Sequence, residues 1–161
     1  MSPLIFPDEI DSISGGGSET IILNEMLHIG GTGQLPNWFL TADFSNVYDL
    51  QLTFPEIQTV PNIDTSNVQS LSFNGCENLV TIPLLATSNV SSMAGAFLGC
   101  TSLSNESLNN ILQMCINATN YGTELYDRRL SSIGLTAEQA QVCTTLSNYQ
   151  AFTNAGWITG Y

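Results

Sequence analysis

The residues that could take part in chemistry are few and widely separated along the chain. The single histidine is His28, and the cysteines are Cys76, Cys100, Cys115 and Cys143. A serine- or cysteine-based nucleophilic site would have to use His28 as its base, but His28 lies within an apolar run, which predicts a structural role. The cysteines form no C-x-x-C pair, so a four-ligand zinc site is not indicated and buried free thiols are expected. We therefore expect a non-enzymatic protein without a metal or cofactor.

Two further patterns that suggest a catalytic or phosphate site fail on closer inspection. The run Gly30-Gly31-Thr32-Gly33 lacks the spacing and the lysine of a phosphate-binding loop. A glycosidase-like pair of carboxylates usually requires a deeper cleft than a thin repeat protein offers. Neither pattern predicts an activity.

The charge composition excludes several classes of partner. The chain has 161 residues, with 14 acidic residues against two basic ones and no lysine, for a net charge of −12. Such a chain cannot neutralise a run of phosphates, so nucleic-acid binding and a polybasic membrane anchor are excluded. It also contains no apolar stretch of the about 18 residues that a membrane span needs, and residues 1–13 have no positive region of the kind that opens a signal peptide.

The surface is expected to be covered by neutral polar groups. Serine, threonine and asparagine together supply 48 residues. Ten of the 14 acidic residues lie within residues 1–80. This uneven acidity favours solubility, and it leaves open a second interpretation, a polyanion mimic that occupies a basic site on another protein.

Two phrases recur along the chain with nearly one period. A Ser-Asn-Val phrase begins at Ser45, Ser66 and Ser88, at spacings of 21 and 22 residues. A second phrase, Phe-x-Gly-Cys-x-x-Leu, begins at Phe73 and at Phe97, 24 residues apart. These periods lie within the range of leucine-rich repeats.

The repeat predicts the fold class. Each unit is expected to form a short strand, a turn and a return segment, and stacking of the units would bury valine under valine and leucine under leucine. Cys76 and Cys100 are equivalent and should stack in the core. We predict an α+β repeat fold, a short leucine-rich-repeat-like β solenoid with a helical C-terminal cap.

Capping signals predict three helices near the C-terminus. Ser104 can cap a helix that continues to Cys115. Thr136 and Gln139 form a capping-box pattern for a second helix. A third helix is expected around residues 149–155, before a glycine.

Four segments are predicted along the chain. They are a flexible arm with a glycine hinge (1–18), an N-terminal cap (19–40), the repeats (41–103) and the helical cap (104–161). The arm is interpreted either as a plain disordered terminus or as a docking arm that binds other protein subunits. The docking residues would be Leu4, Ile5, Phe6 and Pro7.

A recognition surface is expected on the outward side of the strands. Its positions are polar, rich in hydroxyls and uncharged except for one aspartate, so they suit a carbohydrate or a peptide edge, or else they are simply solvated. We call this surface the recognition face, and it comprises Tyr48, Asp49, Gln51, Gln69, Ser70, Ser72, Ser91 and Ser92.

The repeated phrases resemble a known family. Phe-x-Gly-Cys-x-x-Leu, followed by x-x-Ile-Pro and Thr-Ser-Asn-Val, resembles the BspA-like leucine-rich repeats of bacterial surface proteins and gut-bacterial phages, over roughly residues 40–105. The closing residues 155–161 are similar to the ends of such proteins. The resemblance implies a structural or recognition module and supplies no catalytic residues.

The resemblance leads to a functional expectation. We expect an adhesive or structural component of a phage virion, such as a capsid decoration, head fibre or tail-associated protein, made in the host cytoplasm and bound to capsid or tail subunits. Two alternatives stay open: a soluble acidic inhibitor of a host protein, and a fragment of an adhesin on the bacterial cell surface.

Overall fold

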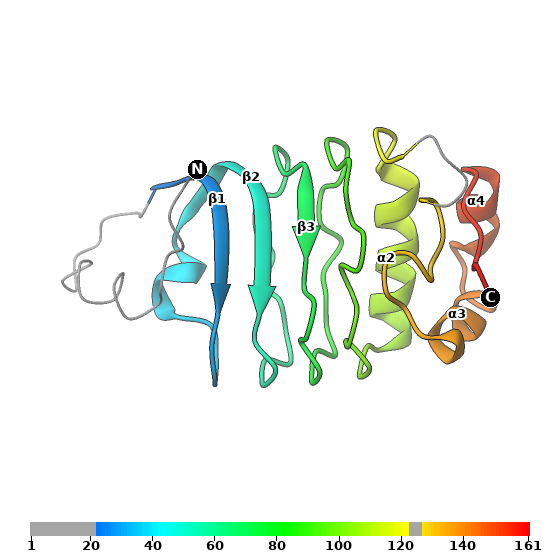
Figure 1. The fold of residues 1–161 in the computed structure, drawn as a ribbon, viewed down its shortest axis with the longest axis horizontal. Coiled ribbons are helices and arrows are strands. Elements are labelled where there is room, and N and C mark those ends of the chain that lie inside the picture. The colour runs from blue at the N-terminus through cyan, green and yellow to red at the C-terminus, as the bar shows by residue number, and fades with distance from the viewer. Residues whose placement is uncertain (1–21, 123–126) are drawn as a thin grey trace.

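The computed structural model describes residues 22–122 and 127–161. In Figure 1 the strands follow one another along the long axis in chain order, and the α-helices lie at the end away from the first strand. The elements are β1 (Ile22–Gly30), the 3-10 helix η1 (Asn37–Leu40), β2 (Asp43–Thr53), β3 (Ser70–Ser72), α2 (Asn105–Asn117), α3 (Ala137–Cys143) and α4 (Tyr149–Asn154).

The three strands form one parallel sheet in the order β1-β2-β3. Leu27 of β1 pairs with Leu50 of β2, and Leu50 pairs in turn with Leu71 of β3. All three leucines are buried, so one face of the sheet covers the core. Because successive strand residues point to opposite faces, the residues beside these leucines are directed outward.

The prediction of a leucine-rich-repeat-like β solenoid with a helical cap is wrong. The described residues form a small α/β arrangement, an open three-stranded parallel sheet with three α-helices. The strands shorten from 11 residues in β2 to three in β3, and the third Ser-Asn-Val phrase is followed only by the isolated bridge between Ser70 and Ser92.

The third repeat is locally irregular. After Met93 the chain continues through Ala94, Gly95 and Ala96, and Gly95 has a φ of +65°, a left-handed conformation that interrupts a regular extended strand. The backbone of this segment still bonds on both sides: Phe73 and Gly75 of the preceding unit donate to the carbonyls of Ala96 and Leu98, while Gly95 and Phe97 donate to those of Ser132 and Ile133. The C-terminal region therefore continues the backbone hydrogen bonding beyond the third repeat.

The repeated phrases still lie side by side, joined by side-chain hydrogen bonds. Asn67 donates to the carbonyl oxygen of Ser45 at 2.6 Å, and Asn89 donates to that of Ser66 at 2.6 Å. The series ends outside the phrases, where Asn120 donates to the carbonyl oxygen of another serine, that of Ser88. The asparagine of the phrase thus satisfies the backbone of the preceding unit, which explains its recurrence.

The three predicted helices are confirmed. Ser104 caps α2 by accepting a hydrogen bond from the backbone N–H of Ser107. Thr136 and Gln139 form the expected capping box of α3. Within the described residues, no helix is long and apolar enough to cross a membrane.

The cysteines are buried free thiols, as predicted. The equivalent residues Cys76 and Cys100 donate to the backbone carbonyls of Leu52 and Phe73. The part of the chain that the structure describes does not include the predicted docking residues Leu4, Ile5, Phe6 and Pro7.

Candidate functional site

The outward face of the sheet gathers polar side chains from all three strands. Asp49 of β2 pairs with Ser70 of β3, and Ser70 forms a parallel bridge with Ser92. Gln51 pairs with Ser72 in the same way. These five predicted residues therefore lie in two neighbouring cross-strand rows, because paired residues point to the same side of a sheet.

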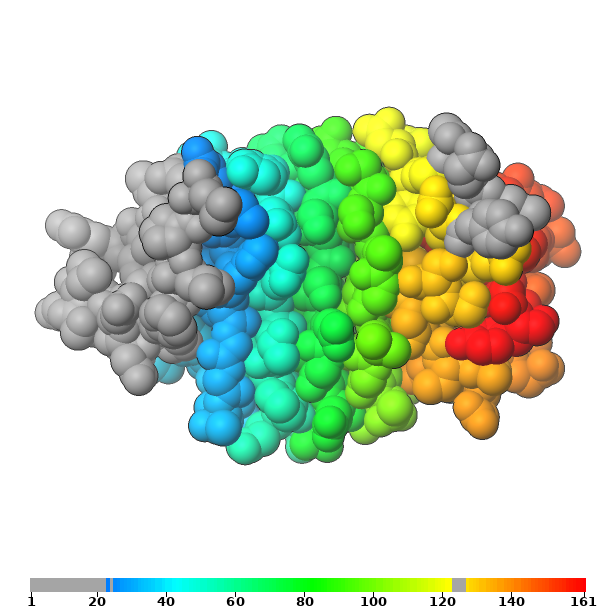
Figure 2. Space-filling view, viewed as in Figure 1, coloured from blue at the N-terminus to red at the C-terminus, as the bar shows by residue number. Residues whose placement is uncertain are grey.

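The remaining predicted residues form a third row beside the first. The backbone N–H of Gln69 donates to the carbonyl of Tyr48, and the N–H of Ser91 donates to the carbonyl of Gln69. All three side chains are exposed, with Tyr48 at 39%. The structure thus brings all eight predicted residues together on one surface, across which the described segments run as parallel bands in Figure 2.

A bulge lies at Tyr48, beside Asp49, and neither residue belongs to the buried core. The pairing of β1 with β2 shifts between Glu25 and Met26, which pair with Val47 and Asp49, so Tyr48 is an extra residue on β2. Glu25 has a φ of 61°, which a residue other than glycine rarely adopts. Such a bulge re-aims side chains at the edge of a sheet, and here it widens the polar surface.

His28 belongs to this surface, although the sequence pattern suggested a structural residue in an apolar run. It pairs with Gln51 and lies between the buried residues Leu27 and Ile29, so its side chain points outward and is 26% exposed. Along the strand, His28 alternates with the apolar residues Leu27 and Ile29. This alternation could have predicted that the side chain of His28 points outward.

His28 and Asp49 form a histidine–carboxylate pair at the recognition face, which is an ion pair when the imidazole is protonated. Nε2 of His28 lies 2.9 Å from Oδ2 of Asp49, whose side chain is 16% exposed. Within the described residues, Nε2 of His28 and Oδ1 of Asp49 are buried and form no hydrogen bond, and no serine hydroxyl is bound to Nε2.

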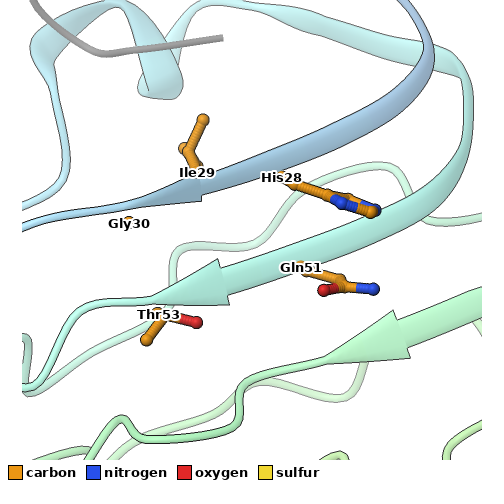
Figure 3. Close-up of a pocket in the computed structure, with 5 residues that line it drawn as sticks. All are labelled: His28, Ile29, Gly30, Gln51 and Thr53. Carbon is orange, nitrogen blue, oxygen red and sulfur yellow. The ribbon is translucent and has the colours of Figure 1, made fainter. Parts of the chain in front are cut away.

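A shallow depression lies beside this histidine–carboxylate pair. It has a volume of about 220 Å³ and is formed where β1 and β2 end. Figure 3 shows the side chains of His28 and Gln51 extending in one direction from neighbouring strands, with Ile29 turned away from them. The lining residues are His28, Ile29, Gly30, Gln51 and Thr53.

The surface is polar but carries little charge. Asp49 is the only acidic residue among the eight predicted positions, and the two arginines of the chain are Arg128 and Arg129 in the C-terminal region. In the described part of the chain, no three His, Cys, Asp or Glu side chains are grouped so that they could hold a metal ion. The hydroxyl, amide and phenol groups of the arrangement can donate and accept hydrogen bonds.

Comparisons with protein-family models, with curated proteins and with solved structures find no match to this chain.

Proposed function

We propose that this protein is a non-enzymatic recognition module, structural or adhesive in role, that binds its target through the recognition face. The observation that carries this proposal is the convergence of eight polar side chains, seven of them uncharged, on one side of the sheet. A face of hydroxyl, amide and phenol groups offers many donors and acceptors on a rigid support, which favours selective binding.

We further propose that the module is part of a phage virion. The resemblance of its repeated phrases to BspA-like repeats supports this placement, and so does the lack of lysine, which leaves a surface wetted by serine, threonine and asparagine. In this proposal the docking arm, with Leu4, Ile5, Phe6 and Pro7, attaches the chain to capsid or tail subunits.

Two charge-matched double variants test the role of the recognition face. Gln69→Lys/Ser92→Lys adds two positive charges on the face, and Gln58→Lys/Ser88→Lys adds the same charges at exposed residues outside it. All four residues are exposed, so both variants should fold. Particles that carry the first variant should adsorb to their bacterial host more weakly, and particles with the second should adsorb normally.

Mass spectrometry of purified particles tests the placement in the virion. The chain should be found in the particles, and deletion of residues 1–17 should abolish its incorporation while the remaining protein keeps its thermal unfolding transition. Absence of the chain from particles would overturn the virion proposal. Equal adsorption by the two double variants would overturn the role of the recognition face.

A further inference from the structure

The depression beside the histidine–carboxylate pair has the size of a subsite for one small group. Its volume of about 220 Å³ is below the roughly 300 Å³ at which pockets for drug-sized ligands begin. The two side chains that extend together over it are those of His28 and Gln51, and Thr53 adds a hydroxyl from β2. A single ring or a terminal group of a larger ligand is the appropriate occupant.

Two polar atoms, one on His28 in the lining and one on Asp49 beside it, are available to a hydrogen-bonding group. Oδ1 of Asp49 only accepts hydrogen bonds, and Nε2 of His28 donates or accepts according to its protonation. Within the described residues neither atom forms a hydrogen bond, although Nε2 lies 2.9 Å from Oδ2 of Asp49. Buried polar atoms seldom lack a hydrogen-bond partner. Both side chains reach the surface, at 26% and 16% exposed, so a small rotation brings either atom to a ligand. A hydroxyl group satisfies both, because it donates and accepts.

Charge disfavours the other simple ligands. Arg128 and Arg129 belong to the C-terminal region, so a phosphate, sulfate or carboxylate would meet only the imidazole of His28 in the depression, and that ring already faces the carboxylate of Asp49. A calcium ion takes six to eight oxygen ligands, usually with several carboxylates, and Asp49 is the only carboxylate on the recognition face.

We propose that the depression formed by His28, Gln51 and Thr53 binds one neutral sugar residue of a carbohydrate. This inference rests on the proposed function, because it names the ligand of the same face. Gln51 would bind the sugar through both its amide N–H and its carbonyl oxygen, while His28 and Asp49 would share a ring hydroxyl. For a ligand of this size the dissociation constant should be about 1–10 mM.

Nuclear magnetic resonance of the nitrogen-15-labelled full chain tests this binding directly. The probes are glucose, galactose, mannose and N-acetylglucosamine, each titrated alone, with calcium chloride as a separate titration. At least one sugar should shift the backbone amide signals of Gly30, Gln51 and Thr53 in a saturable way, and calcium should not. Gln51→Ala should weaken the binding about fivefold or more. Gln58→Ala, an exposed glutamine outside the depression, should leave it unchanged.

Three outcomes would overturn the inference: no saturable shift with any of the four sugars, saturable shifts that map away from the depression, or shifts at Gly30, Gln51 and Thr53 caused by calcium alone. The recognition face itself is tested separately. If the sugars fail while Gln69→Lys/Ser92→Lys still reduces host adsorption, the sugar subsite is wrong and the proposed function stands. If host adsorption is also unchanged, both are wrong.

Discussion

The side-chain amide of Asn89 donates a hydrogen bond to the backbone carbonyl oxygen of Ser66, at 2.6 Å, across 23 residues of sequence. The same bond joins Asn67 to Ser45. A threonine makes a similar connection on the buried side, where Thr65 donates to the carbonyl of Ala86 at 2.7 Å. The repeated phrase therefore serves to join one unit to the next.

The first prediction concerns this connection. Asn89→Ala should lower the free energy of unfolding by about 0.5–1.5 kcal/mol, because it removes the donor and leaves the Ser66 carbonyl to water. Urea denaturation followed by circular dichroism measures the change. Asn78→Ala, at an exposed asparagine outside the phrase, is the control and should be nearly neutral. Equal effects of the two variants would show that the phrase has another role.

The parts of the fold that could be predicted from the sequence are those encoded locally. The start of α2 depends on the hydroxyl of Ser104, and the start of α3 depends on Thr136 and Gln139, all within three residues of the groups they bind. The repeated phrases also indicated correctly which segments lie side by side. The nearly constant period of the phrases suggested that every unit forms an equally regular strand. The structure differs, because β2 has 11 residues and β3 has three.

The failed prediction depended on contacts between distant segments. Regular strand pairing ends after β3, where Gly95 has a positive φ and the N–H groups of Gly95 and Phe97 donate to the carbonyls of Ser132 and Ile133, about 36 residues further along the chain. The repeated phrases contain no signal that predicts Ser132 and Ile133 as hydrogen-bond partners. The outward position of His28 was missed because its apolar run suggested a structural residue, although the alternation of the apolar residues Leu27 and Ile29 around it favours the outward side.

The second prediction tests the register of β3. Leu71 is 1% exposed, and its neighbour Ser70 is half-buried on the outward face. Leu71→Ala should lower the free energy of unfolding by about 2–5 kcal/mol, because it leaves a cavity in the core. Ser70→Ala should change it by less than about 0.5 kcal/mol. The reverse order in urea denaturation would mean that the strand is shifted by one residue.

The third prediction concerns Arg128, which joins the end of α4 to the segment after α2. Its guanidinium donates to the backbone carbonyls of Gly122 at 2.9 Å, Ala155 at 3.0 Å and Tyr121 at 3.1 Å. A lysine cannot reproduce this planar fork. Arg128→Lys should therefore lower the free energy of unfolding by about 2 kcal/mol or more.

Fluorescence of Trp157 gives a second measurement for this variant. The indole is buried and stacks on the ring of Tyr121 at a centroid distance of 5.0 Å. Loss of the Arg128 hydrogen bonds should shift its emission to the red at lower urea concentrations than in the parent protein. Gln141→Ala, at an exposed position on α3, is the control and should leave both measurements unchanged.

The fourth prediction is a loss of stability at alkaline pH, caused by the buried thiols. Burial raises the pKa of Cys143 to about 12, and burial, followed by the nearby Cys76, raises that of Cys100 to about 12. Burial also raises the pKa of Cys115, with a smaller contribution from Cys143. The folded protein therefore holds these protons more tightly than the unfolded chain, in which a thiol titrates near 9.0.

The sign of the effect follows from proton linkage. Between pH 9 and pH 12 the unfolded chain releases thiol protons that the folded protein keeps, so the free energy of unfolding should fall as the pH rises through this range. Below pH 9 these groups should contribute no pH dependence. The urea midpoint measured from pH 7 to pH 11 checks this, and Cys100→Ala/Cys143→Ala should flatten the alkaline part of the curve. The same curve in the parent and the double variant would show that other groups cause the loss.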